Sequence, residues 1–98
     1  MLKKETLDNG MVRVTFRVSH EIWVDRIALV GEFNDWDAHA HCLRQTRGDE
    51  EWHIALELEA GRSYCFRYLV NGEEWMDDDH ADDYEPNADG GFDSVVRT

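Results

Sequence analysis

Apolar and polar side chains alternate along three segments of the chain, and no other feature of the sequence restricts the fold more. The alternating apolar positions fall into three sets: Val12, Val14, Phe16 and Val18; Trp52, Ile54, Leu56 and Leu58; and Tyr64, Phe66, Tyr68 and Val70. Successive side chains of a β-strand point to opposite faces, so each set predicts a strand with one buried and one exposed face.

Shorter apolar stretches and regularly spaced turns extend this pattern to the rest of the chain. Further strands are predicted within 23–33, around 42–44, at 73–75 and at Val95-Val96. Turn signals occur at Gly48-Asp49, Ala60-Gly61 and Asn71-Gly72, roughly the 8–12-residue spacing of a β-sandwich. The acidic segment 76–91, which contains the only proline, is predicted to be irregular. The prediction is therefore an all-β sandwich without a helix of convincing length.

Length and charge limit the number of domains and the kind of ligand. The 98 residues suffice for one small domain, which is predicted to span residues 1–98 with its core at about 12–97. The chain carries 22 acidic and 10 basic side chains, for a net charge of −12. Such a charge repels phosphate backbones and anionic lipid, so nucleic acids and membrane surfaces are disfavoured as partners, whereas a neutral ligand is not repelled.

Features of membrane and secreted proteins are missing from the sequence. No apolar stretch approaches the roughly 20 residues that span a bilayer, and no apolar region follows the basic residues near the start. Cys42 and Cys65 are the only cysteines, and small secreted domains usually contain more, so free thiols are expected rather than a disulfide. A cytoplasmic location is therefore expected.

A tryptophan stands at the tip of a predicted polar turn. The segment Gly31-Glu32-Phe33-Asn34-Asp35-Trp36 follows the apolar run 27–30, and its glycine, asparagine and aspartate favour a turn. A turn does not require an indole, and no apolar periodicity around Trp36 would bury it. An exposed indole is a flat apolar platform for a base, a sugar, a methylammonium group or a partner protein. The alternative is that Trp36 folds back onto the domain, as large aromatic side chains often do.

The third alternating segment predicts further exposed groups that could complete such a platform. If Phe66 and Tyr68 face the core, Arg67 faces outward. The Asn71-Gly72 hairpin then reverses the chain and brings Trp75 close to the strand that carries Arg67. Two indoles beside a guanidinium suit a sugar, because the rings stack on a pyranose while the cation binds its hydroxyls. The alternative is that Trp75 covers the edge of the core and Arg67 pairs with a nearby acid.

Three motifs that follow one another over about residues 12–97 resemble those of a known family. They are Val30–Trp36, the stretch from Gly61 through Tyr64–Gly72 to Trp75, and Gly91–Val96. Their order and spacing resemble carbohydrate-binding module family 48, which includes the glycogen-binding domain of the AMP-activated protein kinase β subunit and the early-set modules of isoamylases and glycogen-branching enzymes. The resemblance implies an immunoglobulin-like β-sandwich of the early-set type.

The resemblance also implies which residues bind the ligand. In the glycogen-binding members two tryptophans and a lysine form the sugar platform, and these positions fall on Trp36, Trp75 and Arg67. Compared with the family pattern, this chain has one extra residue between the hairpin glycine and Trp75. It also has an arginine in place of the lysine, which changes the shape of the basic donor. An asparagine near the last strand falls on Asp93, which can accept the hydrogen bond of the amide but cannot donate one. The kinase members also carry a leucine on the preceding loop, for which the segment 87–91 offers no counterpart.

Metal and catalytic sites are weaker interpretations of the same sequence. His39-Ala40-His41-Cys42 could present two imidazoles, but a complementary pair at the spacing of a zinc site is missing. The acidic segment 77–83 lacks the glycine and terminal glutamate of an EF-hand loop, so a solvated loop is favoured over a calcium site. Neither a phosphate-binding loop nor a nucleophile elbow occurs, so no catalytic residue, metal or cofactor is expected.

The sequence therefore predicts a non-catalytic module for α-1,4-linked glucans such as glycogen, starch or malto-oligosaccharides. Trp36 and Trp75 are expected to stack on glucose rings, and Arg67 and Asp93 to make polar contacts. The alternative is a protein-interaction or scaffolding module of the same fold, which partners a glucan-metabolising enzyme and has little sugar affinity itself.

Overall fold

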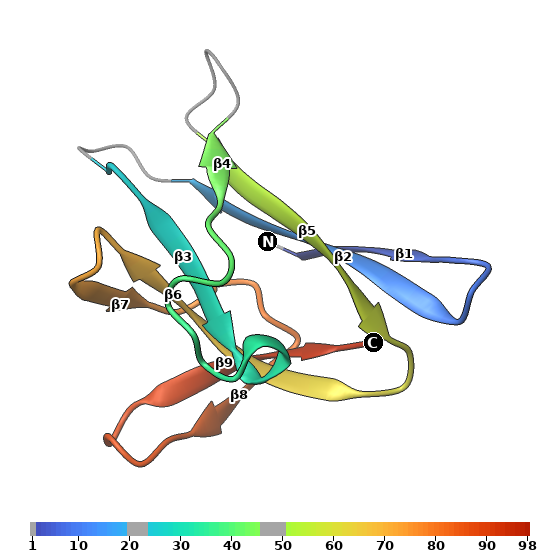
Figure 1. Ribbon diagram of the computed structural model, residues 1–98. Helices are drawn as coiled ribbons and strands as arrows, with labels where there is room; N and C mark the ends of the chain where they lie inside the picture. The colour runs from blue at the N-terminus through green and yellow to red at the C-terminus, as the bar shows by residue number, and fades with distance from the viewer. Residues whose placement is uncertain (1, 20–23, 46–50) are drawn as a thin grey trace.

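The computed structural model describes residues 2–19, 24–45 and 51–98, and almost all of its regular structure is β-strand (Figure 1). The strands are β1 (Leu2–Thr6), β2 (Met11–Ser19), β3 (Ile27–Gly31), β4 (Arg44–Gln45), β5 (Glu51–Glu59), β6 (Ser63–Val70), β7 (Glu74–Met76), β8 (Asp83–Pro86) and β9 (Phe92–Arg97). A short 3-10 helix, η1 (Glu32–Asn34), follows β3. Within these ranges no helix is long and apolar enough to cross a membrane. The predicted turn at Gly48-Asp49 and the predicted strand start at Trp23 lie outside the described residues.

The strands form two antiparallel sheets that lie face to face (Figure 1). One sheet has the order β1-β2-β5-β4, and the other has the order β3-β6-β9-β8, with β7 also paired to β6. The central pairs β2–β5, β3–β6 and β6–β9 join strands that are not neighbours in the sequence. This arrangement is an immunoglobulin-like β-sandwich, so the predicted fold class is confirmed.

The core between the sheets follows the period of two that the sequence shows. The buried side chains on β2 and β6 include Val12, Val14, Phe16, Val18, Phe66, Tyr68 and Val70. The rings of Phe16 and Phe66 meet edge to face, with their centroids 5.1 Å apart. Packing of these two inner faces therefore fixes the register of the sandwich.

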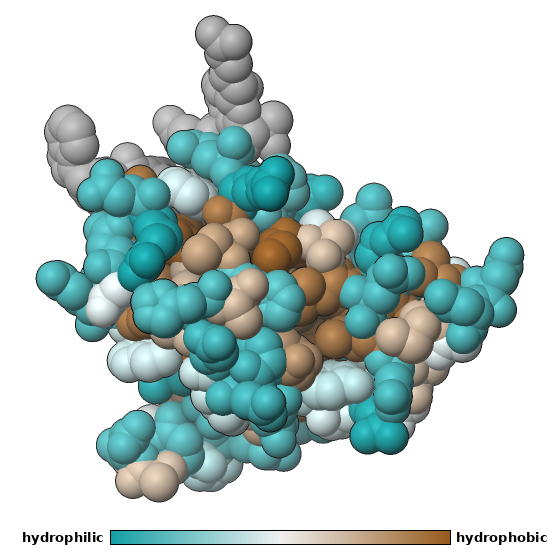
Figure 2. Space-filling model, in the orientation of Figure 1, coloured by the Kyte–Doolittle hydropathy of each residue, from teal (hydrophilic) through white to brown (hydrophobic). Residues whose placement is uncertain are grey.

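The core is less complete along β5, where the predicted burial is met only in part. Trp52 and Leu58 are buried, but Ile54 and Leu56 are only partly buried. The short strand β4 pairs with β5 only at Trp52 and His53, so the rest of β5 forms an edge of its sheet. Figure 2 shows apolar residues gathered in a band near the centre of the view, with hydrophilic side chains on either side.

Two strands occur that the alternation does not predict. Four of the five side chains of β1 are exposed, and so are all four side chains of β8. Both are edge strands, which pair through their backbone groups with β2 and β9 and need no buried face. The prediction that 76–91 is irregular is therefore wrong over Asp83–Pro86, and Pro86 is tolerated because it ends an edge strand.

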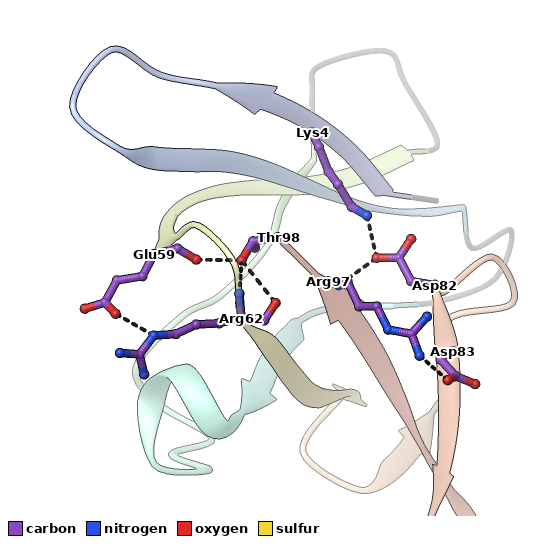
Figure 3. Close-up of polar contacts among 7 residues, drawn as sticks. All are labelled: Lys4, Glu59, Arg62, Asp82, Asp83, Arg97 and Thr98. Atoms are coloured by element: carbon purple, nitrogen blue, oxygen red, sulfur yellow. Dashed lines mark hydrogen bonds and ion pairs between the residues drawn. The ribbon is translucent and has the colours of Figure 1, made fainter.

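Polar contacts tie these edges to the C-terminal strand (Figure 3). Lys4 Nζ lies 2.5 Å from Asp82 Oδ2, and the same carboxylate oxygen accepts a hydrogen bond from the backbone N–H of Arg97 at 2.7 Å. The Arg97 guanidinium pairs with Asp83. Thr98 Oγ1 donates to the carbonyl of Glu59 at 2.5 Å. The end of β9 is thus bound to residues of both sheets.

Candidate functional site

The turn Gly31–Trp36, here called the Trp36 turn, is anchored to the core by its first and third residues. A side chain on Gly31 would place its Cβ 2.7 Å from the carbonyl oxygen of Cys65 and 2.8 Å from Phe66 Cβ, so only glycine fits. The ring of Phe33 lies between those of Phe16 and Tyr64, with centroid separations of 5.7 and 5.9 Å. Close packing at these positions sets where the turn leaves β3.

Hydrogen bonds of Asn34 then close the turn. Its Oδ1 accepts from the backbone N–H of Gly31 at 3.1 Å, and its Nδ2 donates to the carbonyl of Leu29 at 2.8 Å. The N–H of Trp36 donates to the carbonyl of Gly31 at 2.9 Å. Asp35 and Trp36 adopt left-handed φ angles of 55° and 59°. The indole of Trp36 remains 42% exposed, so it does not fold back into the core.

The β6–β7 hairpin places the second tryptophan. Asn71 and Gly72 have φ angles of 53° and 71°, the positive values that a tight turn of this hand requires. Asn71 Oδ1 accepts from the backbone N–H of Asp25 at 2.8 Å and fixes the turn against the start of β3. Trp75 pairs with Leu69 across the hairpin and is 46% exposed. The predicted hairpin is confirmed, and Trp75 is not part of the core.

Arg67 lies on the outer face of β6, as the alternation predicts. Its guanidinium carbon is 5.4 Å from the centroid of the Trp75 ring, within the range of a cation–π contact. Its Nε lies 3.2 Å from Asp77 Oδ1. Arg67 therefore pairs with a nearby acid, as the second interpretation of the sequence expects, and faces the indole of Trp75 at the same time. Its Nη1 and Nη2 groups carry four further N–H donors.

A buried polar contact anchors the segment that carries Asp77. The neighbouring Asp78 is buried, accepts a hydrogen bond from Tyr68 Oη at 2.7 Å, and donates from its backbone N–H to Ser94 Oγ at 2.9 Å. Burial, followed by the nearby Asp78 carboxylate, raises the pKa of Tyr68 well above its usual range. The prediction of a solvated acidic loop is therefore wrong at Asp78.

The β8–β9 hairpin brings the fourth predicted residue to the same face. Asn87 Nδ2 donates to Asp93 Oδ1 at 3.1 Å, while Asn87 Oδ1 accepts from the backbone N–H groups of Asp89 and Gly91, each at 3.0 Å. Asn87 thus orders the tip of the hairpin and orients Asp93. No role was predicted for Asn87 or Asp89, although an asparagine ahead of two glycines is a recognisable turn signal.

These elements surround one hollow of about 290 Å³ on the outer face of the second sheet, here called the outer-face hollow. Its lining residues are Trp36, Arg67, Trp75, Asn87, Ala88, Asp89 and Asp93. All four sequence-predicted site residues therefore lie around the same hollow. Two larger hollows occur elsewhere on the described surface, of about 460 and 570 Å³, and neither is lined by a tryptophan.

The described residues give no support for a metal site or for a reactive thiol at Cys65. No group of three or more His, Cys, Asp or Glu side chains within those ranges is arranged to hold a metal ion. Cys42 and Cys65 are both free, as predicted. Burial raises the pKa of the Cys65 thiol to about 12, helped by its hydrogen bond to Glu85 at 3.2 Å. At neutral pH this thiol is therefore protonated and a poor nucleophile.

Comparison with known proteins adds a family and two relatives. The chain matches the family Carbohydrate-binding module 48 (Isoamylase N-terminal domain) over residues 10–88, a range that includes Trp36, Arg67 and Trp75 and ends before Asp93. It is similar to the 1,4-alpha-glucan branching enzymes of Mesorhizobium japonicum (36% identical over 45 residues) and Agrobacterium fabrum (40% over 50 residues). These alignments cover 45% and 49% of this chain but only 6% and 7% of the two relatives. Because the family match extends over most of its length, the chain belongs to the carbohydrate-binding module 48 family.

Proposed function

We propose that this module binds neutral α-1,4-linked glucans, such as glycogen, starch chains and malto-oligosaccharides, in the outer-face hollow and has no catalytic activity of its own. The observation that carries the proposal is the meeting of Trp36, Arg67 and Trp75 around one hollow of about 290 Å³. Membership of a carbohydrate-binding family supports a sugar ligand, and the branching enzymes among the relatives favour a glucan.

The chemistry of glucose suits these side chains. A glucose ring has an apolar face of C–H groups, on which an exposed indole stacks, and a rim of hydroxyls that donate and accept hydrogen bonds. Trp36 and Trp75 supply the two flat surfaces. Arg67 donates from its terminal nitrogens because its Nε is already bound to Asp77. Asp93 accepts from a hydroxyl, and its bond from Asn87 holds the carboxylate in place.

The charge of the hollow favours a neutral ligand. Asp89 and Asp93 line it together with Arg67, which is itself paired with Asp77. The carboxylates in and beside the hollow therefore outnumber its single cation. They can accept hydrogen bonds from the hydroxyls of a sugar, and their negative charge disfavours phosphate or carboxylate groups. The net charge of −12 acts in the same direction.

A glucan-metabolising enzyme is the proposed protein partner, and the cytoplasm is the proposed location. The module would hold such an enzyme close to its polymer and so raise the local concentration of substrate. The rival function is scaffolding alone, in which the same fold contacts an enzyme and has little sugar affinity. Measurement of glucan binding separates the two functions.

Electrophoresis through a native gel that contains glycogen tests this proposal. The wild-type chain should migrate more slowly than in a gel without glycogen, and Trp36→Ala and Trp75→Ala should restore its mobility. Phe92→Ala is the matched control, because Phe92 is 53% exposed but does not line the hollow, and this variant should be retarded like the wild type. Equal mobility of the wild type in both gels would favour the scaffolding function instead.

A further inference from the structure

The side chain of Asn34 has a fixed orientation in the Trp36 turn. It accepts from the backbone N–H of Gly31 and donates to the carbonyl of Leu29, and each of these backbone groups has only one possible role. One N–H of Nδ2 therefore remains, and Nδ2 lies 3.0 Å from His41 Nδ1. His41 must accept this hydrogen bond, so the neutral ring carries its proton on Nε2.

Protonation of His41 is incompatible with this contact. An imidazolium carries a proton on both nitrogens, so an N–H of His41 would then face an N–H of Asn34 and neither group could accept. Histidine side chains ordinarily titrate at about pH 6.5. The contact is therefore made by one protonation state of His41 and lost in the other.

The backbone of His41 is placed independently of its side chain. Its carbonyl accepts from the N–H of Leu29 at 2.8 Å, and the next residue, Cys42, bridges to Ala28. Protonation or substitution of the His41 ring should therefore leave the backbone of this segment paired with β3. The change should instead affect the hydrogen bond to Asn34, and through Asn34 the Trp36 turn.

The backbone of Trp36 needs such support. Its φ of 59° lies in the left-handed region, which is unfavourable for a bulky side chain and persists only where surrounding contacts hold it. The contacts that hold the turn closed include the bond from the Trp36 N–H to the Gly31 carbonyl and the bonds of Asn34 to Gly31 and Leu29. The hydrogen bond from Asn34 to His41 adds to these contacts and so helps to hold Trp36 in its exposed position.

We infer that His41 is a positioning residue for Trp36 and that it makes glucan binding dependent on pH. The inference rests on the proposed function. Neutral His41 holds Asn34 and keeps the indole in place for stacking. Protonated His41 loses its hydrogen bond to Asn34, so the Trp36 turn is held less firmly and sugar affinity falls.

Charged and titratable groups lie beside His41 on its own segment and on two strands. They line the hollow of about 570 Å³ that His41 shares with the β4 and β5 strands. They are His39 and Cys42 of its own segment, Arg44 of β4 and His53 of β5. None of these lining groups is a carboxylate. On the opposite side the partner is the neutral amide of Asn34.

Affinity for maltoheptaose, measured with the full chain at about pH 7.5 and about pH 5.5, tests the inference. Loss of one hydrogen bond corresponds to about a fivefold weakening, which is expected for the wild type at the lower pH. His41→Asn should bind like the neutral wild type at both pH values, because Oδ1 replaces Nδ1 as acceptor and does not titrate. His41→Ala should be about fivefold weaker at both values. His39→Ala is the matched control and should keep the wild-type pH dependence.

The indole N–H resonance of Trp36 gives a second measurement that needs no sugar. This resonance can be assigned in a ¹H–¹⁵N spectrum because it disappears in Trp36→Phe. It should shift between about pH 7.5 and about pH 5.5 in the wild type and stay constant in His41→Asn. Absence of sugar binding at both pH values would contradict the proposed function, whereas the indole resonance would still decide the coupling. A His41→Asn chain with wild-type pH dependence, or a wild-type resonance that does not respond to pH, would overturn the inference.

Discussion

At the scale of single residues, the two exposed tryptophans should matter for binding and not for folding. Trp36→Ala and Trp75→Ala are each expected to weaken glucan binding by about 1–3 kcal/mol, because each removes one stacking surface. Thermal denaturation should show little change in Tm for either variant, since both indoles are more than 40% exposed.

Trp52→Ala supplies the contrast for this prediction. Trp52 is 8% exposed and belongs to the core, so its loss should lower the free energy of unfolding by about 3–5 kcal/mol. A similar loss of stability in Trp36→Ala or Trp75→Ala would show that those indoles support the fold instead.

Arg67 should contribute to binding as a hydrogen-bond donor. Arg67→Ala is expected to weaken glucan binding by about 1–2 kcal/mol, because it removes the donors and the cation beside the Trp75 ring. Arg67→Lys should lose less, because an ammonium still donates but cannot reproduce the planar fork. Calorimetric titration of the wild type and the two variants measures the order of their glucan affinities. Equal affinities for all three would exclude Arg67 from the site.

At the scale of elements, the β3–η1 junction depends on close packing at Gly31. Gly31→Ala should lower the free energy of unfolding by about 1–3 kcal/mol, because its Cβ would lie 2.7 Å from a backbone oxygen of β6. Gly91→Ala is the matched control, since a Cβ there comes no closer than 3.8 Å to the side chain of Asn87. Chemical denaturation compares the two variants, and equal stability would mean that β3 and β6 can move apart without cost.

The contacts of Asp82 with Lys4 of β1 and with the backbone N–H of Arg97 should contribute less to stability at acid pH (Figure 3). Burial alone would raise the pKa of Asp82, but hydrogen bonds from the Arg97 amide and Lys4 outweigh it and lower the pKa. The pKa of Asp83 is also lowered, first by the Tyr84 N–H and then by Arg97. A lowered pKa means that the ionised carboxylate stabilises the fold above the unfolded value of about 3.9, and this stability is lost as pH falls through the folded value.

Asp82→Asn tests these contacts. The variant should be less stable than the wild type at neutral pH by up to about 1 kcal/mol, and the two should converge below about pH 3. Glu5→Gln, which removes an exposed pair to Arg13 at 3.5 Å, should have almost no effect. Melting curves across this pH range measure both variants, and a difference that persists in acid would rule out the ionised carboxylate as the cause.

Alternation in the sequence predicts the central strands but not the edges. Strand β2 buries one face, and β6 buries Phe66, Tyr68 and Val70, so burial leaves a period of two in the sequence, although Leu69 on the other face of β6 is also buried. Strands β1 and β8 pair through backbone groups at the edges and leave no such pattern. The same limit applies to the site. Arg67 and Trp75 follow from alternation and a hairpin signal, whereas Asn87 reaches the hollow through the path of a loop, which periodicity does not describe.

At the scale of the whole molecule, charge and site chemistry are consistent with one kind of ligand. A chain with a net charge of −12 repels polyanions, and the outer-face hollow adds Asp89 and Asp93 beside its single arginine. A neutral glucan carries no condensed counterions, so its binding should be almost independent of salt. A basic protein partner held by the same acidic surface would behave in the opposite way, because salt screens that attraction.

Calorimetric titration with maltoheptaose at low and high ionic strength tests the central claim most directly. Binding to an open platform with few buried contacts predicts a dissociation constant on the order of micromolar to millimolar. The same constant is expected at both ionic strengths, together with competition by glycogen. Absence of heat at millimolar sugar without competition, or an affinity that falls steeply as salt rises, would contradict the account.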